Sequence, residues 1–101
     1  MVILTRSILN RYSAKYPNAR KSLDQWYDIV KNADWSCPND VRRFFNSADY
    51  VGNHRFVFNI SGNDHRLITV VHFRVRTLYI VFLGTHSEYD RIDASIVRYK
   101  R

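Results

Sequence analysis

The sequence predicts an α+β fold in which two or three N-terminal helices pack on one face of an antiparallel sheet. Two observations support this. Apolar residues recur at helical spacing through the first 45 or so residues, and three runs rich in β-branched and aromatic residues then follow, separated by turns. We expect a single domain over residues 1–101, because a chain of this length can bury a core without disulfides or metals.

The helical half begins after a short apolar segment, Met1–Leu4, which could add a strand at one side of the sheet. Thr5 is a plausible N-cap for a first helix that ends before Pro17. A second helix is expected from about Asn18 to Ala33, and Pro38 suits the first position of a short third helix. The residues expected to face the core are Ile8, Leu9, Tyr12 and Tyr16 in the first helix, Leu23, Trp26, Tyr27 and Val30 in the second, and Val41, Phe44 and Phe45 in the third.

The sheet is expected from three runs, Arg55–Ile60, Arg66–Phe73 and Thr77–Leu83, with Ala48–Val51 as a possible short strand before them. The first two runs are joined by Ser61-Gly62-Asn63-Asp64, whose Gly and Asn tolerate a positive φ. Because alternate residues of a strand share a face, Phe56 and Phe58 should be core, while Arg55 and Asn59 should point to the open side of the sheet.

The composition favours a polyanionic partner. The formal net charge is +7, with a pI near 9.9, and nucleic acid is the commonest ligand of a small basic domain. Twelve of the sixteen basic residues are arginine, which binds phosphate in a bidentate manner and stacks on bases. The alternative left open is a domain that is merely basic. We expect Arg55, Asn59, Arg74 and Arg76 to bind RNA.

Several classes of protein are not favoured. No run approaches the roughly 18 apolar residues of a membrane span, so no membrane partner is expected. The N-terminus lacks the apolar region of a signal peptide, and the single cysteine, Cys37, has no internal partner. These features predict a cytosolic protein. No His and Cys pair has zinc-site spacing, so we predict neither a metal nor another cofactor.

The most conspicuous polar cluster ends the third run, at Gly84-Thr85-His86-Ser87-Glu88-Tyr89-Asp90. Loops that a sheet positions are favoured sites for catalysis, and His86 is the histidine of this cluster. Thr85 or Ser87 could also cap a short helix, with Glu88 in its first turn. Among the other histidines, we expect His72 to be half-buried and His65 to be exposed at the exit of a turn.

The chain resembles the HigB-type toxins of bacterial type II toxin–antitoxin systems, a branch of the RelE/ParE superfamily. The residues that carry the resemblance are Phe58-Asn59-Ile60-Ser61-Gly62-Asn63, Arg66-Leu67-Ile68, and the ending Gly84-Thr85-His86-Ser87-Glu88-Tyr89-Asp90 with Ile92-Asp93. The likeness extends over nearly the whole chain, including the helix with Trp26 and Tyr27. The ending is its most specific part.

The resemblance implies a RelE-like fold and a metal-independent endoribonuclease, or mRNA interferase, that cleaves messages on translating ribosomes. It implies as partners mRNA, the ribosome and a cognate antitoxin of the helix-turn-helix, HigA type. The residues that match the family's motif are Arg66, His86 and Tyr89, which we expect to be catalytic. RelE itself relies on active-site lysines, which the predicted sheet lacks, so the identity of the general base stays open.

Two alternatives belong to other classes. A ParE-like toxin would share the fold but inhibit DNA gyrase, and an RNA-binding module would bind without cleaving. The set Arg66, His86 and Tyr89 favours the nuclease, because a gyrase inhibitor would have no need of it.

Overall fold

The computed structural model describes residues 1–62 and 64–98. Its elements follow one another as β1 (Val2–Leu4), α1 (Ser7–Lys15), η1 (Pro17–Ala19), α2 (Arg20–Asn32), α3 (Pro38–Phe44), β2 (Asp49–Tyr50), β3 (Arg55–Ile60), β4 (His65–His72), η2 (Phe73–Val75), β5 (Thr77–Thr85) and α4 (His86–Tyr89). The predicted α+β class, the three main strands and the three N-terminal helices are confirmed. None of the helices in the described parts of the chain has the length and apolar character that crossing a membrane demands.

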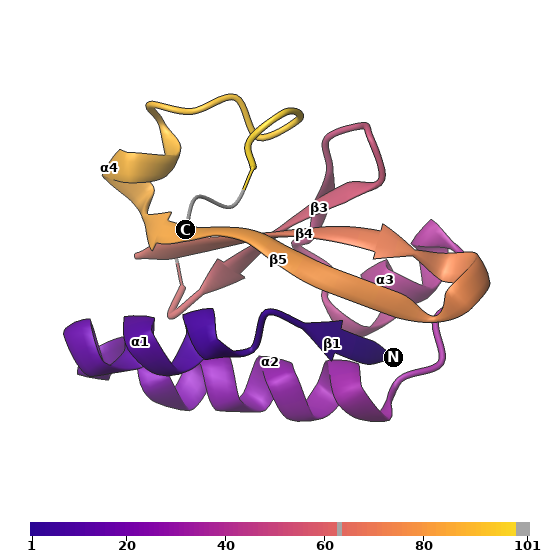
Figure 1. Ribbon diagram of the computed structural model, residues 1–101, viewed down its shortest axis with the longest axis horizontal. Helices are drawn as coiled ribbons and strands as arrows, with labels where there is room; N and C mark the ends of the chain where they lie inside the picture. Colours follow the sequence, from indigo (N-terminus) through magenta and orange to yellow (C-terminus); the bar gives the residue numbers. More distant parts are fainter. Residues whose placement is uncertain (63, 99–101) are drawn as a thin grey trace.

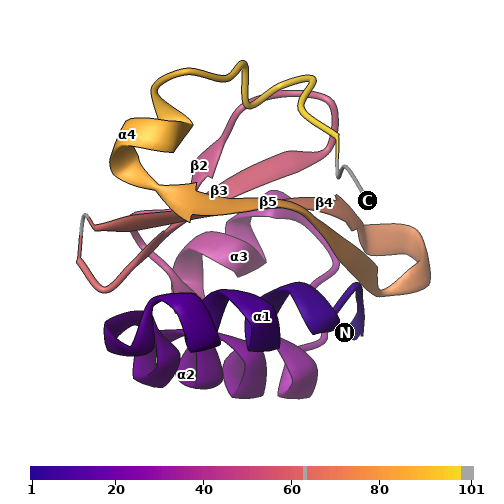
Figure 2. The same cartoon turned by 60° about the vertical axis from the view of Figure 1, so that its left-hand side comes forward.

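The five strands form one sheet in the order β1-β5-β4-β3-β2. β2, β3, β4 and β5 pair antiparallel, while β1 lies parallel to β5 and pairs with only its first residues, Thr77 to Tyr79. Met1–Leu4 therefore does add an edge strand, as the sequence suggested. In Figures 1 and 2, α1, α2 and α3 lie on one side of the sheet, and α4 with the C-terminal segment lies on the other.

The helix-covered face holds the main core. Leu23, Trp26 and Val30 form the apolar stripe of α2 and are almost fully buried. From the sheet they meet Phe56, Phe58 and Ile60 of β3, together with residues of β4 and β5. The Trp26 and Phe58 rings contact each other edge to face at a centroid distance of 5.5 Å. Strand alternation thus predicted the inward face of β3 correctly.

Two predicted details of the helices are wrong. The N-cap position of α1 is Arg6, and the Thr5 hydroxyl instead accepts a hydrogen bond from the backbone N–H of Ile80 in β5, at 2.9 Å. Thr5 has a positive φ of 63°, which turns the chain from β1 into α1. Phe44, which was expected to face the core, is 56% exposed at the end of α3. Of the three core residues predicted for this helix, Val41 and Phe45 do pack on the core.

The second face of the sheet carries a smaller core and is not open throughout. Val57, Ile68, Val70 and Val81 are buried on this face beneath Tyr89, Ile92, Ala94 and Val97. Asp93 begins the covering segment with a local turn, because its Oδ1 accepts hydrogen bonds from the Ser95 backbone N–H and hydroxyl. These bonds hold the pKa of the Asp93 carboxyl below its usual value. Ala94 and Val97 of the following segment pack on this face of the sheet.

Candidate active site

The site begins with a row of three residues that cross the sheet from strand to strand. Asn59 of β3 pairs with Arg66 of β4, and Arg66 pairs with Gly84 of β5. Arg66 shares its face with Ile68 and Val70, so the row lies on the second face, away from α1 and α2. Strand alternation alone did not show which face of β4 is open, and the structure shows that Arg66 lies on the face opposite the N-terminal helices.

Gly84 leaves the space beside Arg66 that a side chain would fill. A Cβ at this position would lie 2.7 Å from the Phe82 ring and 3.2 Å from Glu88 Oε1. The register of β4 and β5 slips at this end of the strands: Ile68 pairs with Phe82 and Thr69 with Ile80, so Val81 is an extra residue. A bulge of this kind redirects the side chains beyond it, and it turns Phe82 onto the face of Val81.

A capping box positions α4 directly above this row. The Thr85 hydroxyl accepts a hydrogen bond from the Glu88 backbone N–H at 3.2 Å, and the Glu88 carboxylate accepts one from the Thr85 backbone N–H at 2.9 Å. The backbone N–H of His86 donates to the Asp64 carbonyl oxygen of the β3–β4 turn, at 3.0 Å. The predicted N-cap and the predicted role of Glu88 are confirmed.

The fixed helix brings Tyr89 to Arg66. The Arg66 guanidinium carbon lies 5.8 Å from the centroid of the Tyr89 ring, a cation–π distance. Arg66 is only 9% exposed, and its Nη1 also donates to the His65 carbonyl oxygen at 3.2 Å. The cation is therefore held in a defined position at the surface of the sheet.

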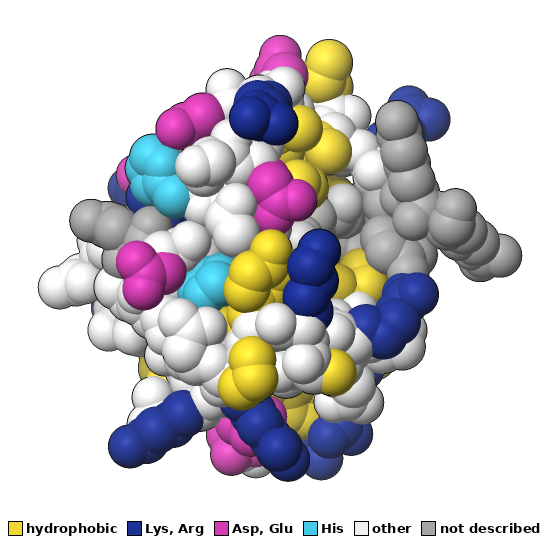
Figure 3. All heavy atoms as spheres, turned by 90° about the vertical axis from the view of Figure 1, so that its left-hand side faces the viewer, with side chains coloured by type: hydrophobic (Ala, Val, Ile, Leu, Met, Phe, Trp, Pro, Cys, Tyr) yellow, Lys and Arg dark blue, Asp and Glu magenta, His cyan; other side chains and the backbone are white. Residues whose placement is uncertain are grey.

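His86 stands on the exposed side of α4. Its Nδ1 lies 3.1 Å from Oδ2 of Asp90, one helical turn further on, and about half of each side chain is exposed. Figure 3 looks onto this end of the molecule and shows histidine and acidic side chains near one another, with Lys and Arg mainly along the lower and right-hand edges. Arg66, His86 and Tyr89 thus come from neighbouring elements at one end of the sheet.

The predicted RNA-binding residues do not form one surface. The expectation that Arg55 points to an open face is wrong, because the C-terminal segment covers it. Arg55 is only 9% exposed, and its Nη1 donates to the Ala94 and Val97 carbonyl oxygens of that segment. Asn59 is exposed beside Arg66, as expected. Arg74 is exposed in η2 at the other end of the sheet, where Arg76 forms an ion pair with Asp34 at 2.6 Å.

Two of the histidines are placed opposite to expectation. His65 is 3% exposed, and its Nδ1 lies 2.6 Å from the Tyr12 hydroxyl, because α1 covers the start of β4. Burial raises the pKa of the Tyr12 phenol, so the hydroxyl keeps its proton and can donate it to the imidazole. His72, expected to be half-buried, is exposed at the end of β4. Neither position was readable from strand alternation alone.

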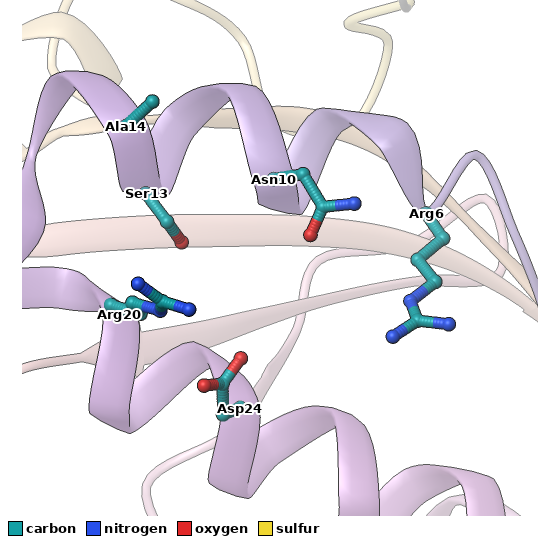
Figure 4. Close-up of a pocket in the computed structure, with 6 residues that line it drawn as sticks. All are labelled: Arg6, Asn10, Ser13, Ala14, Arg20 and Asp24. Carbon is teal, nitrogen blue, oxygen red and sulfur yellow. The ribbon is translucent and has the colours of Figure 1, made fainter.

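A separate cavity lies within the helix layer, on the other side of the sheet from this site (Figure 1). It has a volume of about 430 Å³ and lies between α1 and α2, lined by Arg6, Asn10, Ser13, Ala14, Arg20 and Asp24. Figure 4 shows Arg20 and Asp24 from α2 facing Asn10 and Ser13 from α1. None of the predicted site residues lines it. Within residues 1–62 and 64–98, no three His, Cys, Asp or Glu side chains are grouped so that they could hold a metal ion.

A small basic α+β domain that holds Arg, Tyr and His together at one end of its sheet has the features of a protein that acts on a phosphate-containing polymer. The model of the HigB toxin family, described as the RelE-like toxic component of a toxin–antitoxin system, matches residues 19–92. The chain belongs to this family and is the toxin of such a system, with an antitoxin as partner.

Curated relatives agree over nearly the whole chain. The mRNA interferase HigB of Escherichia coli O6:H1 (strain CFT073) is 28% identical over 94 residues, which cover 91% of each chain. The mRNA interferase toxin HigB of Escherichia coli K12 is 30% identical over 97 residues, 93% of this chain and 92% of that protein. The mRNA interferase HigB of Shigella flexneri has the same identity and coverage. The resemblance found in the sequence is therefore confirmed.

Proposed function

We propose that this toxin is an endoribonuclease, an mRNA interferase, that cleaves messages on translating ribosomes in the cytosol without a metal ion or other cofactor. Family membership and the names of the relatives support the RNase activity. The structural observation that supports the site is the contact between the Arg66 guanidinium and the Tyr89 ring. Tyr89 lies on α4, the helix that also carries His86. The antitoxin partner is proposed to be a helix-turn-helix protein of the HigA type.

In the proposed reaction, the ribose 2′-oxygen attacks the adjacent phosphorus, and the bond from phosphorus to the 5′-oxygen of the next nucleotide breaks. The 2′-OH loses a proton and the leaving 5′-oxygen gains one, so the products are a 2′,3′-cyclic phosphate and a 5′-hydroxyl. Arg66 stabilises the extra negative charge that develops on the phosphorane, because its guanidinium stays charged and is held in place before the reaction.

His86 is the proposed proton-transfer residue. A neutral imidazole that takes the 2′-OH proton becomes an imidazolium, which can then protonate the 5′-oxygen, so one histidine can serve both steps. The Asp90 carboxylate at 3.1 Å orients the ring through Nδ1 and leaves Nε2 for the substrate. Tyr89 holds Arg66 and offers a ring face on which a base can stack.

RNA binding is proposed to involve Asn59 beside Arg66, with Arg74 and Arg76 contacting phosphates farther along the message. Arg55 contributes from beneath the C-terminal segment, whose carbonyl oxygens its Nη1 contacts. Contacts of this kind depend on salt, because each neutralised phosphate releases counterions. We expect message binding to weaken as the salt concentration rises.

The test is to add the purified toxin, separated from its antitoxin, to translating ribosomes and to map message breaks by primer extension. The expected result is discrete cleavage with the wild-type protein and little with His86→Gln. A control outside the site is Tyr50→Ala, which removes an exposed ring that packs on Phe56. A folded wild-type protein that leaves messages intact but inhibits DNA gyrase would overturn the proposal in favour of the ParE-like alternative.

A further inference from the structure

Three rings form a row at the end of the sheet opposite α4. The His54 and His72 rings lie 5.6 Å apart, and the His72 and Tyr79 rings are stacked with centroids 6.0 Å apart and planes 29° apart. His54 and His72 are exposed, and Tyr79 is half-buried. The row brings together the chain before β3, the end of β4 and the start of β5.

The row lies on the face that carries Arg66. Tyr79 pairs with Val70 across β4 and β5 and packs on the second core with it. Alternation along β4 places His72 on the same face as Val70 and Arg66. From Arg66 to Val70 the strand rises about 13 Å, at roughly 3.3 Å per residue. The rings are therefore too far from Arg66 to contact the nucleotide at the scissile bond.

A cationic cavity adjoins the row. It has a volume of about 420 Å³, and the described residues that line it are Arg55, Tyr79, Val81 and Arg98, none of which carries a side-chain carboxylate. Arg55 is 9% exposed, and its Nη1 binds the carbonyl oxygens of Ala94 and Val97. Among the described residues, none accepts a hydrogen bond from its buried Nε. A buried cation with an N–H to spare is suited to an anionic oxygen.

We propose that the ring row and this cavity form a second nucleotide subsite for single-stranded RNA, which positions the message relative to Arg66 and His86. Exposed rings stack on bases of any sequence, and two arginines beside them neutralise the connecting phosphates. His54, His72 and Tyr79 are positioning residues in this scheme, and Arg55 and Arg98 receive a phosphate. The inference rests on the proposed function, since RNA is the ligand of both sites.

The test uses two RNAs that contain the mapped cleavage position, with deoxyribose at the scissile nucleotide so that neither is cut. The long RNA extends several nucleotides to each side, and the short one is trimmed to the nucleotides around the scissile bond. The variant His54→Ala/His72→Ala removes both exposed rings without touching the core. We expect it to raise the Kd of the long RNA about tenfold, the effect of losing one stacked base, and to leave the short RNA unchanged.

Two further variants separate stacking from other causes. His54→Phe/His72→Phe keeps the rings and should retain the wild-type Kd for the long RNA. Tyr50→Ala removes a ring that is 47% exposed and packs on Phe56, which faces the helix side, so it should change neither Kd. With 2-aminopurine at an outer position of the long RNA, wild-type protein should quench its fluorescence, and the double alanine variant should not.

An unchanged Kd for the long RNA in the double alanine variant would overturn the subsite, as would an equal loss with both RNAs. Failure of the proposed function is distinguishable. If the wild type cleaves no message on ribosomes, the nuclease is excluded, and the ring dependence is then measured with a single-stranded RNA of the same length and arbitrary sequence; ring-dependent binding of that RNA would retain the subsite. If the wild type cleaves messages but the Kd of the long RNA does not depend on the His54 and His72 rings, the nuclease would be retained and the subsite excluded.

Discussion

The Nδ1 atom of His86 lies 3.1 Å from a carboxylate oxygen of Asp90, and the two residues are one helical turn apart at the end of β5. A carboxylate at this position fixes the orientation of an imidazole, as in other His–Asp pairs. We therefore add Asp90 to the proposed site; it was not singled out from the sequence, although it belongs to the same polar cluster. The i, i+4 spacing from His86 was the available signal.

His86→Gln should reduce the single-turnover cleavage rate by about 10² to 10⁴-fold, the usual contribution of positioned acid–base catalysis. Glutamine keeps the size and hydrogen bonding of the side chain but cannot shuttle a proton. Asp90→Asn should cause a smaller loss, because the imidazole remains and only its orientation is weakened. Both variants should bind RNA normally. A normal rate in His86→Gln, with loss in His54→Gln, would place the chemistry at the other end of the sheet.

Arg66→Ala should cost about 2–4 kcal/mol in transition-state stabilisation, comparable to the loss of an oxyanion-hole donor. The change also removes the partner of the Tyr89 ring, so thermal unfolding must be measured beside the cleavage rate. Arg66→Lys is the matched variant: it keeps the charge but loses the planar, bidentate geometry, and it should recover part of the rate. Unchanged cleavage by a folded Arg66→Ala protein would exclude the proposed role.

The cleaved message should carry a 2′,3′-cyclic phosphate and a 5′-hydroxyl, because the proposed nucleophile is the neighbouring 2′-oxygen. The ends can be identified on messages cleaved on ribosomes, where magnesium must be present for the ribosome itself. A message with deoxyribose at the scissile nucleotide should resist cleavage. Products with a 3′-hydroxyl and a 5′-phosphate would instead indicate attack by water and contradict the metal-independent mechanism.

Tyr12 should make the stability of the protein depend on pH in the alkaline range. Its pKa is raised in the folded state by burial, so the folded protein disfavours the phenolate more than the unfolded chain does. The stabilisation is present below the unfolded pKa of about 10 and is lost as the pH rises above it. Urea unfolding at a series of pH values should show a free energy of unfolding that falls above about pH 10.

The matched variant is Tyr12→Phe, which removes the titrating group and the hydrogen bond to His65. At neutral pH it should be about 1–3 kcal/mol less stable, because the buried imidazole loses its partner. Its free energy of unfolding should fall less steeply than that of the wild type above about pH 10. Parallel curves for the two proteins would show that Tyr12 does not contribute to the alkaline loss.

The helices and main strands were predictable because their signals are local. The spacing of Leu23, Trp26 and Val30 specifies one buried face of a helix, and the alternation of Phe56 and Phe58 specifies one buried face of a strand. The capping box of Thr85 and Glu88 is likewise a local signal, because it depends on residues only three positions apart. Arg66, His86 and Tyr89 could be named from the family's motif, since they match it residue by residue.

By itself, the sequence determined the fold class, because helices and strands depend on spacing along the chain. Its resemblance to the HigB-type toxins supplied the family and the residues of the candidate site. The tertiary structure alone decided which side chains meet. α1 lies over the start of β4 and buries His65, and the C-terminal segment folds back over Arg55. The bulge at Val81 and the absence of a side chain at Gly84 leave room for α4 to set Tyr89 over Arg66. These contacts join residues distant in sequence, and hydrophobic periodicity carries no information about such pairs.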